Sequence, residues 1–292
     1  MPEGESRSLR DLRDLVDPVV VAAFGGWNDA GSAATGTVEH LEEAYGAEPV
    51  FALDPDDFYD FQVNRPRVHL GEDGQRGISW PTTELKISSL PDGRDLVLVL
   101  GLEPNLRWRA FCRELIGYVE RLGVTKVITL GALLTDTPHT RPTPVTGTSY
   151  DAASASELRV EPTSYQGPTG IVGVFQNACV EAGVPAISFW AAVPHYVSQA
   201  RVPKAAVALL HRIEELLDVE VPLGALPEQA EEWERTVSEM AEADDEVREY
   251  VRQLEEQAEA DADTLSKASG DEIAADFERY LRRRGTGGAG GG

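Results

Sequence analysis

The sequence predicts an α/β fold followed by a helical C-terminal extension, and three observations lead to this. Up to about Val221, short apolar runs of strand length alternate with amphipathic stretches, which is typical of strands and helices sharing one sheet. From Pro227 onward the composition becomes acidic, with apolar positions at helical spacing. The length of 292 residues favours one large domain with an appendage over a single larger core.

The first unit along the chain is a strand, a turn and a helix. The run Pro18 to Phe24 is apolar and β-branched, as expected of a buried strand. Two glycines break this run, and Asn28 or Asp29 can then cap a helix that reaches about Tyr45.

The same alternation predicts further elements in the body. Strands are expected at 49–53, 95–100, 126–130 and 184–193, and helices at 106–122, 170–182 and 199–218. Two segments are expected to be irregular. One is the proline-containing, aromatic loop 54–67, and the other is the Thr-, Ser-, Pro- and Gly-rich stretch 131–168, whose length is typical of functional loops.

The chain therefore divides into four predicted parts. These are an N-terminal segment, 1–17; the α/β body, 18–222; an acidic helical extension, 223–284; and a flexible Gly-rich tail, 285–292. Residues 228–284 hold 19 acidic and 8 basic residues. The extension can fold back onto the body, or it can pair with another chain.

Charge and cysteine content exclude several function classes. The net charge of −24 repels phosphate backbones and anionic lipids, so neither nucleic acid nor a membrane surface is expected as a partner. Cys112 and Cys179 cannot supply a disulfide framework or a zinc cluster, which favours a cytoplasmic location. The longest apolar runs are strand-sized and the N-terminus lacks an apolar core, so no membrane span or export signal is expected.

The turn after the first strand is the first candidate binding site. It contains Gly25, Gly26, Trp27, Asn28 and Asp29. Backbone N–H groups and a helix dipole at such a place can bind an anion. The segment matches neither the dinucleotide motif nor the phosphate-loop motif, so a tight turn with Trp27 covering the sheet end and Asn28 or Asp29 capping the helix is the favoured interpretation.

Two loops supply the remaining candidates. Tyr59, Asp60 and Arg65 belong to an aromatic and polar cluster with a composition typical of contact surfaces. His139 lies three residues after Asp136, and His195 follows a predicted strand, so an acid–base pair is conceivable. No nucleophile elbow, His-Glu-x-x-His run or paired cysteine is present, so no catalytic residue, metal or cofactor is assigned.

Several motifs together resemble the proteasome assembly chaperone two family. The first is the run from Val21 to Gly31, which reads VAAFGGWNDAG. The others are Tyr59-Asp60-Phe61 with Arg65-Pro66, Leu98 to Pro104 with Trp108, Leu130 to Leu133, and Val193 to Val197. Their joint occurrence in this order, from about Val19 to Leu217, is most similar to actinobacterial members with a helical C-terminal extension.

The resemblance implies a three-layer α/β/α sandwich similar to the phosphorylase/hydrolase-like fold. It also implies self-association, with trimers among bacterial members. The eukaryotic namesakes act in proteasome assembly. A similar fold does not carry phosphorylase activity with it. Residues 273–281 before the glycines also resemble the C-terminus of the prokaryotic ubiquitin-like modifier, and an amphipathic helix explains that likeness.

These observations favour a protein-binding, assembly-chaperone-like function over an enzymatic one. The alternative is a ligand-binding protein or enzyme acting on a small anion or nucleoside at the carboxyl ends of the strands. A third hypothesis is a purely structural role in which the extension drives self-association. The sequence leaves the identity of any partner open.

Overall fold

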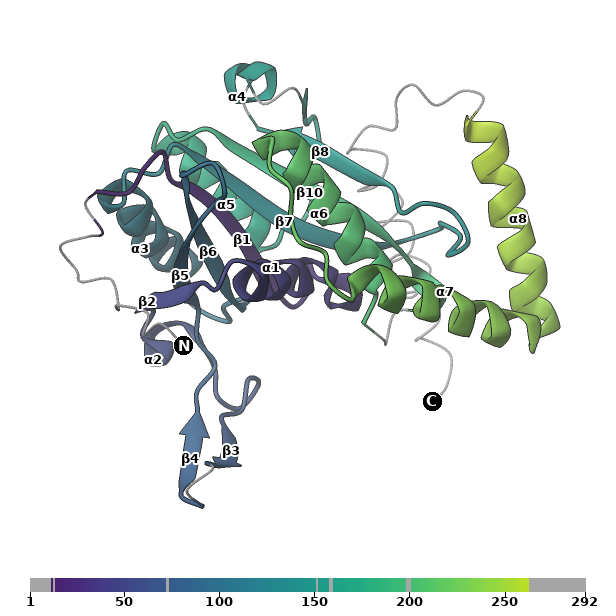
Figure 1. The fold of residues 1–292 in the computed structure, drawn as a ribbon, viewed down its shortest axis with the longest axis horizontal. Coiled ribbons are helices and arrows are strands. Elements are labelled where there is room, and N and C mark those ends of the chain that lie inside the picture. The colour runs from purple at the N-terminus through teal and green to yellow at the C-terminus, as the bar shows by residue number, and fades with distance from the viewer. Residues whose placement is uncertain are drawn as a thin grey trace.

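A central mixed sheet with helices on both faces forms the body of the protein (Figure 1). The computed structural model describes residues 12, 14–71, 74–150, 152–157, 160–197 and 201–262. The eight strands of the sheet lie in the order β2-β5-β6-β1-β7-β10-β8-β9. The predicted α/β fold and its three layers are confirmed.

Four parallel strands form the centre of the sheet, and the strands next to them on either side pair with them antiparallel. The central strands are β6 (Asp95–Leu102), β1 (Val19–Gly25), β7 (Lys126–Thr135) and β10 (Ala186–Pro194). At one edge lie β5 (Glu84–Ser89) and β2 (Glu48–Ala52); at the other lie β8 (Val145–Ser149) and β9 (Glu161–Pro162). Because the central strands are parallel, their carboxyl ends lie at one edge of the sheet.

Helices cover both faces of this sheet. One face carries α1 (Ala33–Ala44) and α6 (Pro203–Leu217), and the other carries α3 (Trp108–Arg121) and α5 (Ile171–Glu181). Short elements are η2 (Ala30–Ser32), α2 (Pro55–Phe58), α4 (Ala152–Glu157) and η3 (His195–Val197). The extension consists of α7 (Leu226–Glu242) and α8 (Asp245–Ala262).

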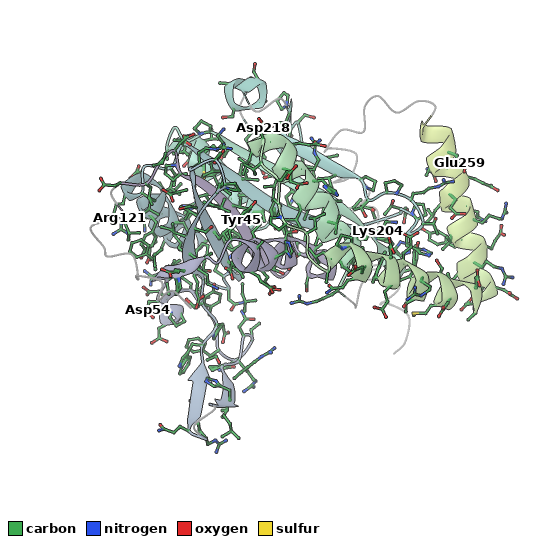
Figure 2. The ribbon with its side chains drawn as sticks, in the orientation of Figure 1. Tyr45, Asp54, Arg121, Lys204, Asp218 and Glu259 are labelled. Atoms are coloured by element: carbon green, nitrogen blue, oxygen red, sulfur yellow. The ribbon has the colours of Figure 1, made fainter. Side chains whose placement is uncertain are left out.

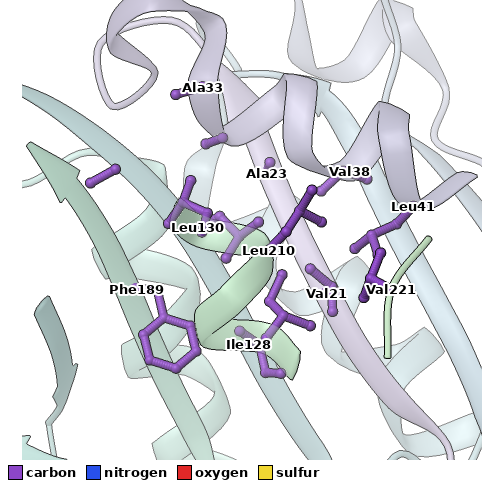
Figure 3. Packing of buried hydrophobic residues seen from close by; sticks show 14 of the residues in the cluster. Val21, Ala23, Ala33, Val38, Leu41, Ile128, Leu130, Phe189, Leu210 and Val221 are labelled. Carbon is purple, nitrogen blue, oxygen red and sulfur yellow. The ribbon is translucent and has the colours of Figure 1, made fainter. Parts of the chain in front are cut away.

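The sequence of β1 explains why both faces are covered. Val19, Val21 and Ala23 pack under α1 and α6, as Figure 3 shows for Val21 and Ala23. The intervening residues of the strand, Val20, Ala22 and Phe24, pack against α3 and α5. Successive side chains of a strand point to opposite faces, so an uninterrupted apolar run needs a helix layer on each side.

The prediction of an irregular segment at 131–168 is wrong in part. Strand β7 continues to Thr135, β8 pairs antiparallel with β10, and α4 forms a short helix. Four of the five residues of β8 are Thr, Val or Ser, and its threonines suit a pleated edge strand even though the segment reads as a polar loop.

Three further strands were not predicted from the sequence. Strand β5 has only its alternate positions buried as large apolar residues, Leu85 and Ile87, so its apolar signal is short. Strands β3 (Arg67–Leu70) and β4 (Arg76–Ser79) form a separate two-stranded sheet that projects from the body (Figure 1). Every residue of β3 is exposed, so no buried pattern marks it.

The extension folds back onto the body in the described residues. Helix α7 packs against α6, and Val251 and Leu254 of α8 are buried. The division into four parts stays a prediction, and residues 263–292, which include the whole predicted Gly-rich tail, lie outside the described residues. No helix among the described residues is long and apolar enough to cross a membrane.

Candidate functional site

The glycines of the predicted site join the ends of two neighbouring strands. Gly25 O accepts a hydrogen bond from Glu103 N at 2.8 Å. Gly26 has φ of +143°, and a Cβ on it would lie 3.1 Å from Glu103 Cβ. Glycine is required here because the turn combines a positive φ with close approach of the β6 end.

Asn28 and Asp29 connect this turn to its neighbours. Asn28 O accepts a hydrogen bond from Ala132 N of β7 at 2.8 Å. Asp29 Oδ1 accepts hydrogen bonds from Ala34 N at 2.8 Å and Thr35 N at 3.2 Å, and Asp29 Oδ2 accepts from the Thr35 hydroxyl. Asp29 therefore caps the first turn of α1, although Ser32 occupies the formal N-cap position.

A second carboxylate, that of Glu103, caps the N-terminus of helix α5. Glu103 Oε1 accepts a hydrogen bond from Ile171 N at 2.9 Å, at the start of α5. Asn28 is 3% exposed, and its Oδ1 lies where a Cβ on Gly170 would be only 1.8 Å away. That amide oxygen accepts no hydrogen bond from the described residues. The α5 N-terminus is thus surrounded by acceptor oxygens of the chain itself.

This arrangement disfavours an anion at the strand ends. Helix N-termini bind anions through free N–H groups and the positive end of the dipole. Here Asp29 already accepts from Ala34 N and Thr35 N of α1, and Glu103 accepts from Ile171 N of α5. Burial raises the pKa of Asp29 above its ordinary value, although its hydrogen bonds to Thr35 and Ala34 oppose the shift. Trp27 is 39% exposed and does not bury itself over the sheet end.

The predicted contact cluster after β2 is divided between interior and surface. Tyr59 is 3% exposed, and its hydroxyl bonds to Thr83 Oγ1 at 2.8 Å and donates to Leu102 O at 3.0 Å. Asp60 N donates to Asn105 Oδ1 at 2.9 Å, and Arg65 is exposed. Tyr59 therefore fixes the loop to the β6 end, while Arg65 faces solvent.

His139 lies between the body and the helical extension. Its side chain is almost completely buried, at 2% exposure. Nδ1 lies 2.8 Å from the Tyr196 hydroxyl, and Nε2 lies 3.0 Å from Ser238 Oγ of α7. Ser238 donates its own proton to Glu234 O, so the network assigns the neutral tautomer with the proton on Nε2.

Charged side chains around His139 hold both extension helices. Lys204 of α6 donates to His139 O at 2.7 Å and forms an ion pair with Glu234 of α7. Thr140 donates to Glu255, and Arg141 pairs with Glu259, both on α8. Figure 2 shows Lys204 on the body side and Glu259 on the far helix. The loop after β7 therefore holds the extension against the body.

His195, at the end of β10, also contacts the extension. Its Nδ1 lies 3.4 Å from Asp136 Oδ1, and its ring lies 5.4 Å from that of Tyr250 in edge contact. The Tyr250 hydroxyl donates to Asp136 Oδ1 at 3.0 Å. His195 and Asp136 are thus neighbours, but they support Tyr250 of α8.

The candidates of the glycine turn and the two histidines form two separate groups. Gly25 and Gly26 meet Glu103 and Asn28 meets Gly170 at the strand ends, while Asp29 bonds to the first turn of α1. The two histidines meet α7 and α8. The sequence prediction missed the roles of Glu103 and Gly170. The available signals were a carboxylate directly after a strand and a glycine directly before a helix.

Both cysteines are buried in the interior. Burial raises the pKa of the Cys112 thiol to about 12 and also raises the pKa of Cys179, so both thiols stay protonated. No group of three or more His, Cys, Asp or Glu in the described part of the chain is placed to hold a metal ion.

Comparison with known proteins decides the family. The sequence pattern of the PAC2 family matches residues 23–241, which is more than half of the chain. The chain belongs to the PAC2 family. This confirms the resemblance to the proteasome assembly chaperone two family. None of the curated proteins compared matches the chain.

Solved structures of PAC2 proteins are highly similar. A PAC2 family protein from Streptomyces avermitilis is 56% identical with a TM-score of 0.76, covering 80% of this chain and 100% of that chain. A Mycobacterium tuberculosis proteasome-assembly chaperone homologue is 54% identical with a TM-score of 0.73, covering 80% and 99%. An archaeal proteasome activator from Pyrococcus furiosus, at 20% identity and a TM-score of 0.61 over 78% and 94%, shares the fold.

The cap on α1 predicts the effect of changing Asp29. Asp29→Ala removes three accepted hydrogen bonds and should lower the free energy of unfolding by about 1–2 kcal/mol. Asp29→Asn should lose less than about 0.5 kcal/mol, because asparagine caps equally well. Urea denaturation measures both, with the exposed Glu39→Ala of the same helix as control. Equal losses for Asp29→Ala and Glu39→Ala would contradict the role.

The burial of His139 predicts a pH dependence of stability. Desolvation lowers its pKa below 6.5 in the folded chain, with Glu234 and Glu255 opposing and Lys204 adding to the shift. The unfolded chain then binds the proton more readily, so stability is full above about pH 6.5 and falls as the pH decreases through that value. His139→Gln should flatten this fall in urea unfolding between pH 8 and pH 5.5, whereas exposed His69→Gln should not. Parallel curves for His139→Gln and the unchanged protein would rule the effect out.

Proposed function

We propose that this protein is an assembly-chaperone-like protein that binds other protein chains, with the proteasome as its partner, and that it acts in the cytoplasm. The observation that carries the proposal is the 54% identity to a chain described as a proteasome-assembly chaperone homologue, over 99% of that chain. The strand ends support it, because Asp29 and Glu103 occupy the places where a small anion would bind.

Self-association is part of the same proposal. Assembly chaperones act through surfaces, and repeated copies multiply weak contacts to a symmetric partner. The contacts around His139 support self-association indirectly, because they fix α7 and α8 to the body and leave the acidic outer faces of these helices to solvent.

Proteasome assembly in the native cells tests the proposed partner. Deleting the gene should raise the fraction of unassembled proteasome α and β subunits, because their assembly loses a binding partner. Native gel electrophoresis and subunit-specific antibodies measure that fraction, and re-expression of the full chain is the control. Unchanged assembly in the deletion strain, together with no co-purification of proteasome subunits with the tagged chain, would reject the proteasome as partner.

A further inference from the structure

The hairpin that projects from the body has two different faces. We call residues 63–80, which include β3 and β4, the arm (Figure 1). In its register Val68 lies opposite Ile78 and His69 lies opposite Gly77. Since successive side chains alternate between faces, Val68, Leu70 and Ile78 share one face, with Arg76 beside Leu70.

On the face that carries His69, the side chains contact other residues of the arm. The His69 ring lies over Gly77, where a Cβ would be 2.4 Å from Nε2. His69 Nδ1 also lies 3.1 Å from Ser79 Oγ. This face is polar and needs no partner.

The opposite face leaves apolar side chains in water. Val68, Leu70 and Ile78 are 57%, 71% and 55% exposed, and Trp80 at the base is 49% exposed. A two-stranded hairpin is marginally stable alone in water, and a third layer on its apolar face is what normally stabilises it. Clustered exposed apolar residues of this kind mark a protein interaction site. The apolar face of the arm is therefore suited to cover by another chain.

Charge indicates what kind of chain can cover it. The arm carries Arg65, Arg67 and Arg76 against Glu72 and Asp73, so it is net basic by formal count. The whole chain has a net charge of −24. A second copy of this chain therefore presents an acidic surface to a basic arm, and it is always present at matching concentration.

A second copy also offers a matching apolar surface. Trp27, Leu102 and Leu106 are 39%, 37% and 50% exposed at the carboxyl ends of β1 and β6. Glu103 lies on the loop after β6, and the segment that carries Asp57 and Asp60 contacts that loop, because Arg107 pairs with Asp57 and Asp60 N donates to Asn105 Oδ1. We call Trp27, Leu102 and Leu106 the strand-end patch. The other large exposed apolar side chains outside the arm are scattered over separate elements: Val16, Tyr150 and Met240.

We propose that the apolar face of the arm docks onto the strand-end patch of a second copy of this chain. The inference rests on the proposed self-association and names the surfaces that produce it. The arm and the strand-end patch are different surfaces, so two copies can exchange arms about a two-fold axis, or several copies can close into a ring. The turn from Gly25 to Asp29 then forms part of the surface that receives the arm.

Size-exclusion chromatography with light scattering on the full chain tests the docking. The unchanged protein should have a multiple of the 31.7 kDa chain mass, and the triple variant Val68→Ser, Leu70→Ser, Ile78→Ser should fall to 31.7 kDa. Leu106→Ser should lower the mass in the same direction. Met240→Ser, an equally exposed apolar change outside both surfaces, should keep the full mass. Circular dichroism melts confirm that each variant is folded.

Each contrary result identifies what fails. A 31.7 kDa mass for the unchanged protein overturns both self-association and the arm contact. An oligomer that persists in the triple variant overturns the arm contact and leaves self-association standing. A monomeric triple variant with a fully oligomeric Leu106→Ser overturns the strand-end patch as the acceptor. None of these masses bears on proteasome binding, which the assembly measurement tests separately.

Discussion

The structure depends on two carboxylates that close helix N-termini at the carboxyl ends of the parallel strands. Asp29 caps α1 and Glu103 caps α5. In many α/β proteins this edge binds a phosphate or another anion through those same N–H groups. Here the chain satisfies them itself, and the glycines at 25 and 26 bring the two loops close enough to do so. The strand ends become a fixed surface and not a cavity for an anion.

With the strand ends closed, the parts available for function are the surfaces attached to the body. The loop after β7 holds the extension through His139, Thr140 and Arg141. At the other side, the segment after α2 rises into the arm, whose base is fixed by Tyr59. Projecting elements that are held rigidly by the body suit a protein that binds other chains, because they lose little conformational entropy on docking.

Much of the fold could be predicted from the sequence, and the misses have physical reasons. Strand β1 and helix α3 carry long apolar patterns, so both were predicted. Strand β5 and the arm have short or exposed patterns that hydrophobic periodicity cannot detect. The cap by Asp29 was predictable because Asn28 and Asp29 lie between the glycine turn and the helix. The contact of His139 with Ser238 spans 99 residues and depends on how the extension folds back, which no local pattern encodes.

The melting temperature in the presence of inorganic phosphate and nucleosides tests the central claim most directly. A ligand that binds only the folded chain adds about 2.7 kcal/mol of stability at a hundred times its Kd, which raises the melting temperature measurably. If Asp29 and Glu103 close the strand ends, the melting temperature should stay constant across the series. A dose-dependent rise with phosphate or a nucleoside would contradict the account.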